Sequence, residues 1–240
     1  MITPDHYYGG SPICLVKSAD GRYSAASAAS NSVTPAVPLS VWTTRSTGIN
    51  SVVLAGYGNG NFLISGNNGS GTINKISTDV ITWTTVTTTL TAQAFSIAYG
   101  NGVWVMGGQY GQVSRSTNAV SWTSQNAFFE FASGQQGNVT SPVRGMAYGN
   151  GVFLAVGAFE GLRIRTSTDG ITWVSRANGS PSGFANDAEY GNGIWVIVGG
   201  GNSGFNSFRS TDTITWTTHL NTSSTSVAYG NGTWVAVAGA

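Results

Sequence analysis

The stretch YGNGVWV, residues 99–105, decides the fold, because its first four residues occur five times in the chain. The copies follow one another at intervals of 42, 49, 42 and 39 residues, beginning at Tyr57, Tyr99, Tyr148, Tyr190 and Tyr229. Asn-Gly between two short apolar runs is the strongest local signal for a β-hairpin, since a type I′ turn needs positive φ at both central residues. A repeat of about 40–45 residues that holds several short strands is typical of a propeller blade.

A second motif follows the hairpins and is complete as STDGITW at residues 167–173, with further copies at 77–83, 116–122 and 210–216. Ser, Asp and Asn side chains bond their own backbone in tight turns, so the motif predicts a turn between the third and fourth strands of a blade. One position holds Asp79, Asp169 and Asp212 in three copies and Asn118 in the fourth. An amide can cap a turn but cannot replace a carboxylate in acid–base chemistry, so we interpret these acids as structural.

The two motifs predict an all-β fold, a five-bladed β-propeller of four-stranded antiparallel blades, over residues 21–240. The third and fourth strands of the last blade are expected at residues 22–26 and 41–44, so that strands from both termini close it and no edge strand stays open. The alternative is an open β-solenoid, which needs atypical capping repeats. Residues 1–20 precede the repeats and are expected to form an N-terminal arm, which is either an anchor to a neighbouring subunit or a tail.

The composition limits the partners that the chain can bind. Charged residues make up 8% of its 240 residues, against about 25% in an ordinary soluble domain, and the net charge is +1. Because no basic field exists to steer nucleic acid or to hold anionic lipid, we expect neither as a partner. No apolar run approaches the roughly 20 residues that cross a bilayer, and the first residues do not form a secretory signal. The chain is therefore expected to fold in a cytoplasm.

Few residues are suited to catalysis or to metal binding. The chain has one cysteine, Cys14, and two histidines, His6 and His219. This excludes a disulfide framework and a cysteine-based metal cluster, and leaves little for a Ser/His/Asp arrangement. The tryptophans and the five repeat tyrosines occupy equivalent repeat positions, so we interpret them as packing residues rather than sugar platforms. The sequence therefore predicts no catalytic residue, no metal, no cofactor and no enzymatic activity.

Asp187 and Glu189 are the acidic residues that break the repeat. They fall on a strand expected to line the central channel, and residues two apart on a strand face the same side. Other blades hold small or apolar residues at these positions, such as Ser96 and Ala98. The pair could raise one carboxyl pKa, or hold a cation or another ligand in the channel. The alternative is a solvated channel wall in which the acids pair with Arg144.

Aromatic residues outside the repeat positions gather on one face. In a four-stranded meander, the connections from second to third strand and from one blade to the next share a face, which we call the loop face. Blade packing does not need aromatic residues there, and aromatic clusters on loops are typical of binding surfaces. The alternative is that the loop around Phe128 folds over the channel mouth and plugs it. The candidate ligand- or partner-binding residues are Tyr110, Phe128, Phe129, Phe131, Phe159, Phe184 and Phe205.

The motif STDGITW resembles the Asp-box repeat of sialidases and related propellers, with a turn one residue shorter, over residues from about 41 to 240. That resemblance implies the fold and not the activity, because the motif is structural in that family. Together with Tyr-Gly-Asn-Gly, it is also similar to repeats of tailed-phage virion proteins, particularly tail-associated ones.

From these features we expect a non-enzymatic structural or binding propeller module of a phage-like virion, either in its tail or decorating its capsid. The loop face would contact other virion proteins or a cell-surface glycan, as part of a larger assembly. Two alternatives stay open. One is a free-standing glycan-binding lectin, and the other is a sialidase-like glycoside hydrolase, for which only Asp187 and Glu189 offer a carboxyl pair.

Overall fold

The computed structural model describes residues 44–69, 71–125, 142–158, 162–176, 184–200, 207–220 and 223–237. Within these ranges the chain forms strands β1 to β18 and one three-residue 3-10 helix, η1 (Gln109–Gly111). The all-β class predicted from the sequence is therefore confirmed.

Four sheets contain four antiparallel strands each, joined in chain order as simple meanders. The first sheet consists of β1 (Ser51–Gly58), β2 (Asn61–Asn67), β3 (Thr72–Ser77) and β4 (Thr84–Val86). The second consists of β5 (Ala94–Gly100), β6 (Val103–Gly108), β7 (Val113–Ser116) and β8 (Thr123–Gln125). The third consists of β9 (Val143–Gly149), β10 (Val152–Ala158), β11 (Leu162–Ser167) and β12 (Val174–Arg176). The fourth consists of β13 (Phe184–Gly191), β14 (Ile194–Gly200), β15 (Ser207–Ser210) and β16 (Thr217–Leu220).

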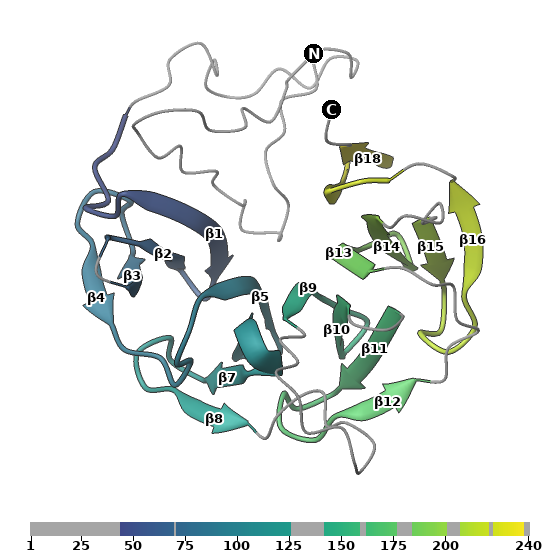
Figure 1. Ribbon diagram of the computed structural model, residues 1–240, viewed down its shortest axis with the longest axis horizontal. Coiled ribbons are helices and arrows are strands. Elements are labelled where there is room, and N and C mark those ends of the chain that lie inside the picture. Colours follow the sequence, from purple (N-terminus) through teal and green to yellow (C-terminus); the bar gives the residue numbers. More distant parts are fainter. Residues whose placement is uncertain are drawn as a thin grey trace.

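A fifth sheet consists of two strands, β17 (Ser226–Gly230) and β18 (Thr233–Val237). Figure 1 shows the sheets arranged as an arc, in which β1, β5, β9 and β13 lie toward the centre and β4, β8, β12 and β16 form the rim. Each inner strand packs beside the next, from β1 through β5, β9 and β13 to β17. This radial order is the one that the repeat predicts.

The predicted closure of the ring depends on residues that the structure does not describe. The strands expected at residues 22–26 and 41–44 and the arm expected at residues 1–20 lie outside the described residues, apart from Thr44. In the described part of the chain, β17 and β18 end the arc without a third or a fourth strand. The count of five blades stays a prediction.

The Tyr-Gly-Asn-Gly motif forms the turn between the two inner strands of every sheet. The central Asn and Gly have φ values of 46–49° and 74–78° in the five copies, as a type I′ turn requires. All of these Asn and Gly residues are exposed. The motif therefore marks an outer face of the molecule, which we call the turn face, and the predicted hairpins are confirmed.

The Tyr and the first Gly of the same motif hold neighbouring sheets together. Each repeat tyrosine packs on the aromatic residue opposite it in its own hairpin, with ring centroids 4.6–4.9 Å apart, as for Tyr99 and Trp104. The ring also covers the backbone of the preceding repeat, since the ring of Tyr148 lies where a side chain at Gly100 would be. Only glycine fits under the ring, because a Cβ would overlap it. The next repeat tyrosine covers Gly58, Gly149 and Gly191 in the same way.

The hydrophobic core lies between adjacent sheets rather than in one central cluster. Leu63 and Trp104 belong to the cluster between the first two sheets, and Leu154 and Trp195 to the cluster between the third and the fourth. Trp104 and Trp195 are only 1% and 2% exposed. Burying a large apolar side chain to this extent contributes about 1.5–3 kcal/mol. These two tryptophans are packing residues, as predicted.

An Asp or Asn cap closes the tight turn between the third and fourth strands of each four-stranded sheet. In the first sheet, one carboxylate oxygen of Asp79 accepts the N–H groups of Ile81 and Thr82 at 2.8 and 2.7 Å. The same oxygen accepts the Ser77 hydroxyl at 2.9 Å. In the second sheet the amide oxygen of Asn118 accepts the equivalent three bonds. The second motif is therefore a structural turn, as predicted.

These hydrogen bonds lower the pKa of the capping carboxyls, because they stabilise the ionised form. The backbone N–H of Thr82, followed by that of Ile81, lowers the pKa of Asp79 from 3.8 to about 2. The N–H groups three and two residues after Asp212 likewise lower its pKa to about 2. The N–H groups two and three residues after Asp169 also lower the pKa of that carboxyl.

Acid should therefore weaken these turns in a defined pH range. A carboxyl whose pKa is lowered by folding stabilises the fold fully above its unfolded value of 3.8, and this contribution is lost as the pH falls toward about 2. We expect the double substitution Asp79→Asn and Asp212→Asn to keep both caps, as Asn118 does, and to flatten the dependence of Tm on pH. Thermal unfolding followed by circular dichroism from about pH 5 to pH 2 measures this dependence. An unchanged slope would contradict the role of the two carboxyls.

Substitution of Gly100 by Ala should destabilise the fold, because the new Cβ would overlap the ring of Tyr148. Overpacking of this kind costs about 1–3 kcal/mol, which chemical denaturation measures. Gly102→Ala in the same hairpin is the matched control: its Cβ would meet no atom within 4 Å, so it reports only the strain at a φ of 75°. In a Tyr148→Ala background the effect of Gly100→Ala should largely disappear. An effect that persists there would show that the ring is not its cause.

Candidate binding surface on the loop face

A β-bulge recurs near the start of the inner strand of each four-stranded sheet. The register between the inner strand and the second strand skips one residue at Val53, Phe95, Arg144 and Asn186. Each of these residues lies four positions before the repeat tyrosine of its sheet. Because a bulge bends the strand and re-aims the bulged side chain, the four positions differ from the regular ladder. We call these four residues the bulge row.

The bulge row connects neighbouring sheets at the loop face. The guanidinium carbon of Arg144 lies 6.0 Å from the centroid of the Phe95 ring, which is within the range of a cation–π contact. The side-chain amide of Asn186 donates to the carbonyl of Ser224 at 3.0 Å. Arg144 is exposed and Val53 is 42% exposed. The row therefore presents a cation and an apolar side chain to solvent.

Tyr110 occupies a strained turn directly after β6. Its φ and ψ are 60° and 23°, in the left-handed region, which costs a residue with a side chain about 1–2 kcal/mol. The Tyr110 side chain is 51% exposed, so burial of the ring offsets little of this cost. Strained residues that the surrounding structure holds in place cluster at ligand sites and other functional sites.

Hydrogen bonds to the preceding loop hold the Tyr110 turn in place. The Gly108 N–H donates to the carbonyl of Gln112 at 2.9 Å, and the Gln109 N–H donates to the carbonyl of Gln93 at 2.9 Å. The Gln112 amide bonds Thr91 at both ends: its oxygen accepts the Thr91 N–H at 2.9 Å, and its nitrogen donates to the Thr91 hydroxyl at 2.7 Å. The ring of Tyr110 is therefore presented on a fixed backbone.

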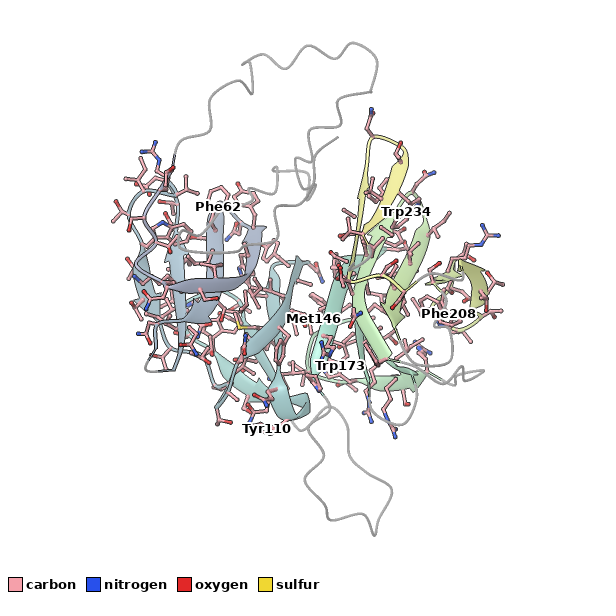
Figure 2. The ribbon with its side chains drawn as sticks, turned by 45° about the horizontal axis from the view of Figure 1, so that its top comes forward. Phe62, Tyr110, Met146, Trp173, Phe208 and Trp234 are labelled. Carbon is pink, nitrogen blue, oxygen red and sulfur yellow. The ribbon has the colours of Figure 1, made fainter. Side chains whose placement is uncertain are left out.

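The Tyr110 turn and the bulge row belong to one surface. The helix η1 packs beside β9, the strand that carries Arg144, as can be followed in Figure 1. Figure 2 shows Tyr110 at the edge of the molecule, away from Phe62 and Trp234, which follow the hairpin turns of the turn face. The surface thus combines an exposed ring, an exposed guanidinium and side-chain amides. This chemistry suits a ligand that has both apolar faces and hydrogen-bonding groups.

The structure describes two of the seven aromatic residues that the sequence places on the loop face. Tyr110 lies in η1, and Phe184 begins β13 with 42% exposure. Both are on the loop face, because β6 ends and β13 begins there, but they belong to the second and the fourth sheet. The other five lie outside the described residues: Phe128, Phe129, Phe131, Phe159 and Phe205. The alternative that the loop around Phe128 plugs the channel mouth therefore also concerns residues outside the described ones.

The first member of the predicted acidic pair, Asp187, connects two sheets. Its Oδ2 accepts the Ser226 hydroxyl at 2.7 Å and the Val227 N–H at 3.0 Å, and both of these groups belong to β17. Ser96 makes the equivalent connection between the second and third sheets, where its hydroxyl donates to the carbonyl of Val143 at 2.9 Å. Asp187 therefore takes part in sheet-to-sheet packing at a position that does so in another repeat.

The second member, Glu189, lies on the same strand, and its Oε1 accepts the backbone N–H of Tyr190 at 3.1 Å. A role of the pair in holding a cation or another ligand stays a prediction. Within the described ranges, no three His, Cys, Asp or Glu side chains lie together as metal ligands would. The same part of the chain contains no helix that is long and apolar enough to span a membrane.

No protein-family model matches the chain, and no curated protein matches it. Its fold is similar to that of a virginiamycin B lyase from Staphylococcus aureus, with a TM-score of 0.57 and 12% identity over 80% of this chain and 63% of that one. An alpha-L-arabinofuranosidase from Clostridium thermocellum gives a TM-score of 0.49 and 14% identity over 75% of this chain and 78% of that one. YCF48 bound to a D1 peptide gives 0.44 and 12% over 59% of this chain, which spans 44% of that one. These neighbours are β-propeller-type proteins, and the chain has a β-propeller-type fold.

The prediction that the chain is not an enzyme is overturned by these neighbours. The neighbour with a TM-score of 0.57 is a lyase, so a fold of this type occurs in an enzyme. The small number of histidines and cysteines does not by itself exclude catalysis, because pairs of carboxyl groups can also catalyse reactions. At 12% identity the likeness concerns the fold, and no catalytic residue is transferred from it.

Substitution of Tyr110 by Gly should stabilise the protein although it removes a large side chain. Relief of the left-handed strain gains about 1–2 kcal/mol and the freer unfolded backbone loses about 0.5–1, so we expect a net gain of about 0.5–1 kcal/mol. Val80→Gly, at a φ of 55° in a turn cap, is a matched control and should also be tolerated, because Gly170 fills the equivalent position in the third sheet. Chemical denaturation measures both. A clear loss of stability in Tyr110→Gly would mean that the ring is a packing residue.

Proposed function

We propose that this propeller is the binding module of a phage-like particle, and that its loop face binds a glycan on a cell surface. The observation that carries the proposal is the Tyr110 turn. The side chain of Tyr110 is 51% exposed, although its backbone adopts the left-handed conformation. Hydrogen bonds to a neighbouring loop hold this turn in place. A strained and exposed aromatic residue is costly for folding and useful for binding.

The groups around Tyr110 fit a carbohydrate. Sugar rings have C–H faces that stack on aromatic rings, and hydroxyls that bond to amides, hydroxyls and guanidinium groups. Gln109 and Gln112 flank Tyr110, and Thr91 lies against Gln112. Arg144 adds an exposed cation on the neighbouring strand, which would favour a sugar that carries a carboxylate.

Repetition of the sheets supports binding through many weak contacts. Phe184 places a second exposed aromatic residue on the same face, two sheets away from Tyr110. Two shallow sites on one rigid scaffold strengthen each other by raising the effective concentration of a multivalent ligand. A glycan-coated cell surface is such a ligand.

The particle part of the proposal is supported by the two sequence motifs. Their combination is similar to repeats of tailed-phage virion proteins, and the Asp-box resemblance fits the turn caps at Asp79, Asp169 and Asp212. The low content of charged residues, 8% of the chain, also fits a protein built into a larger assembly.

A glycan array probed with the full chain, followed by calorimetric titration with the strongest ligand, tests the glycan site. We expect Tyr110→Gly to weaken binding at least tenfold, which corresponds to about 1.4 kcal/mol. Val80→Gly should leave the affinity unchanged, because it relieves the same strain on the turn face. Equal affinities of the wild type and Tyr110→Gly would contradict the site.

Mass spectrometry of purified particles tests the assembly role, together with the genes that flank the coding sequence. Presence in the particle, with capsid and tail genes as neighbours, is the expected result. A chain that binds glycans only as a free protein would instead be a lectin. Turnover of the bound glycan would identify a hydrolase.

A further inference from the structure

No tyrosine ring of the described residues covers Gly230, and we call the space over this glycine the tyrosine socket at Gly230. In the described part of the chain, the other four glycines that follow a repeat tyrosine lie under the ring of the next one, as Gly100 lies under Tyr148. At Gly230, by contrast, no atom of the described residues lies within 4 Å of the position that a Cβ would take. Tyr57, the repeat tyrosine of the first sheet, is among the described residues, so the first sheet does not fill the socket.

The strand next to this socket is more exposed than its equivalents in the other sheets. Six residues after the repeat tyrosine, Leu63, Val105 and Leu154 are each 0% exposed, whereas Val235 on β18 is 52% exposed. Figure 1 shows β1 at one end of the arc of sheets and β18, which pairs with β17, at the other. This apolar position is buried in the first three sheets and partly exposed at Val196 in the fourth, so Val235 needs a cover of the same kind, that is, another repeat.

The sequence contains a matching repeat that does not have the full motif. Tyr8-Gly9-Gly10 begins 49 residues before Tyr57, the same interval that separates Tyr99 from Tyr148. An apolar run at residues 13–16 begins five residues after Tyr8, just as the run Phe62-Leu63-Ile64 begins five residues after Tyr57. Of the tyrosines outside the described residues, Tyr7, Tyr8 and Tyr23, only Tyr8 is followed by the glycine of the repeat.

We propose that the ring of Tyr8 occupies the socket at Gly230, so that the N-terminal segment is the partner of the β17–β18 surface. The segment then stands between β17 and β1 as a repeat of its own, and Gly9 takes the position that receives the ring of Tyr57. Each tyrosine thus covers the glycine of the preceding repeat around the whole ring. This closure differs from the one expected from the motif count, in which β17 would lie directly beside β1.

A double-mutant cycle in the full 240-residue chain tests the contact. We expect Gly230→Ala and Tyr8→Ala each to lower the Tm by several degrees, and the double variant to lower it no further than the more damaging single change. The matched control combines Tyr8→Ala with Gly100→Ala, whose effects should add, because Gly100 lies under Tyr148. Tyr8→Phe keeps the ring and should keep the wild-type Tm, which is decisive if the Ala variants fail to fold.

Four results would overturn the proposal. The first is an unchanged Tm in Gly230→Ala, and the second is a Tm loss in Tyr8→Phe as large as in Tyr8→Ala. The third is coupling of Gly230 to Tyr57 in place of Tyr8, which would favour direct closure onto β1. The fourth is coupling that appears only as protein concentration rises, with a dimer in analytical ultracentrifugation, which would make a second copy of the chain the partner.

Discussion

The contact between a repeat tyrosine and the glycine backbone of the preceding repeat, made by Tyr99, Tyr148, Tyr190 and Tyr229, sets the distance between neighbouring sheets. This contact requires a hairpin that holds the tyrosine in a fixed position. It also requires a glycine, because only a residue without a Cβ leaves room for the ring. The type I′ turn satisfies the first, and the residue directly after the tyrosine satisfies the second, so four consecutive residues carry the whole arrangement. The clusters that bury Trp104 and Trp195 form where this spacing brings two sheets together.

The turn face is regular and structural, whereas the loop face varies from sheet to sheet. On the turn face, the hairpins and the Asp or Asn caps repeat with nearly the same geometry from sheet to sheet, because any departure would disturb the packing beside it. On the loop face the ladder is broken by a bulge in each sheet, and the bulged residues differ in chemistry from Val53 to Arg144. Loops held by a rigid scaffold are free to vary, which is why binding groups gather there. Tyr110 belongs to this variable part.

The number of repeats that share an acidic residue does not by itself show whether that residue is structural. Asp79, Asp169 and Asp212 were set aside as turn caps because an Asn replaces them in one repeat, and their hydrogen bonds agree with that interpretation. Asp187 attracted attention because it breaks the repeat, yet it bonds β17 as Ser96 bonds β9. The scarcity of histidine and cysteine predicts a protein without catalysis, whereas a lyase has a similar fold. The composition gives the number of each residue type, whereas catalysis depends on which side chains lie close together in the folded protein.

The sequence alone determined the hairpins, the turn caps and the order of strands from centre to rim, because each follows from contacts between residues close together in the chain. It also placed Tyr110 on the loop face, since the end of β6 follows from the hairpin. The bulges at Phe95 and Arg144 were not predictable from the sequence. The spacing of the motifs gives the length of each repeat, but it does not show which residue of a strand lacks a partner in the ladder. Only the tertiary structure decided that Gln112 holds the turn in place through Thr91 and that Asp187 joins two sheets. These contacts join residues 21 or more positions apart, and nothing in the local sequence fixes which distant groups will meet.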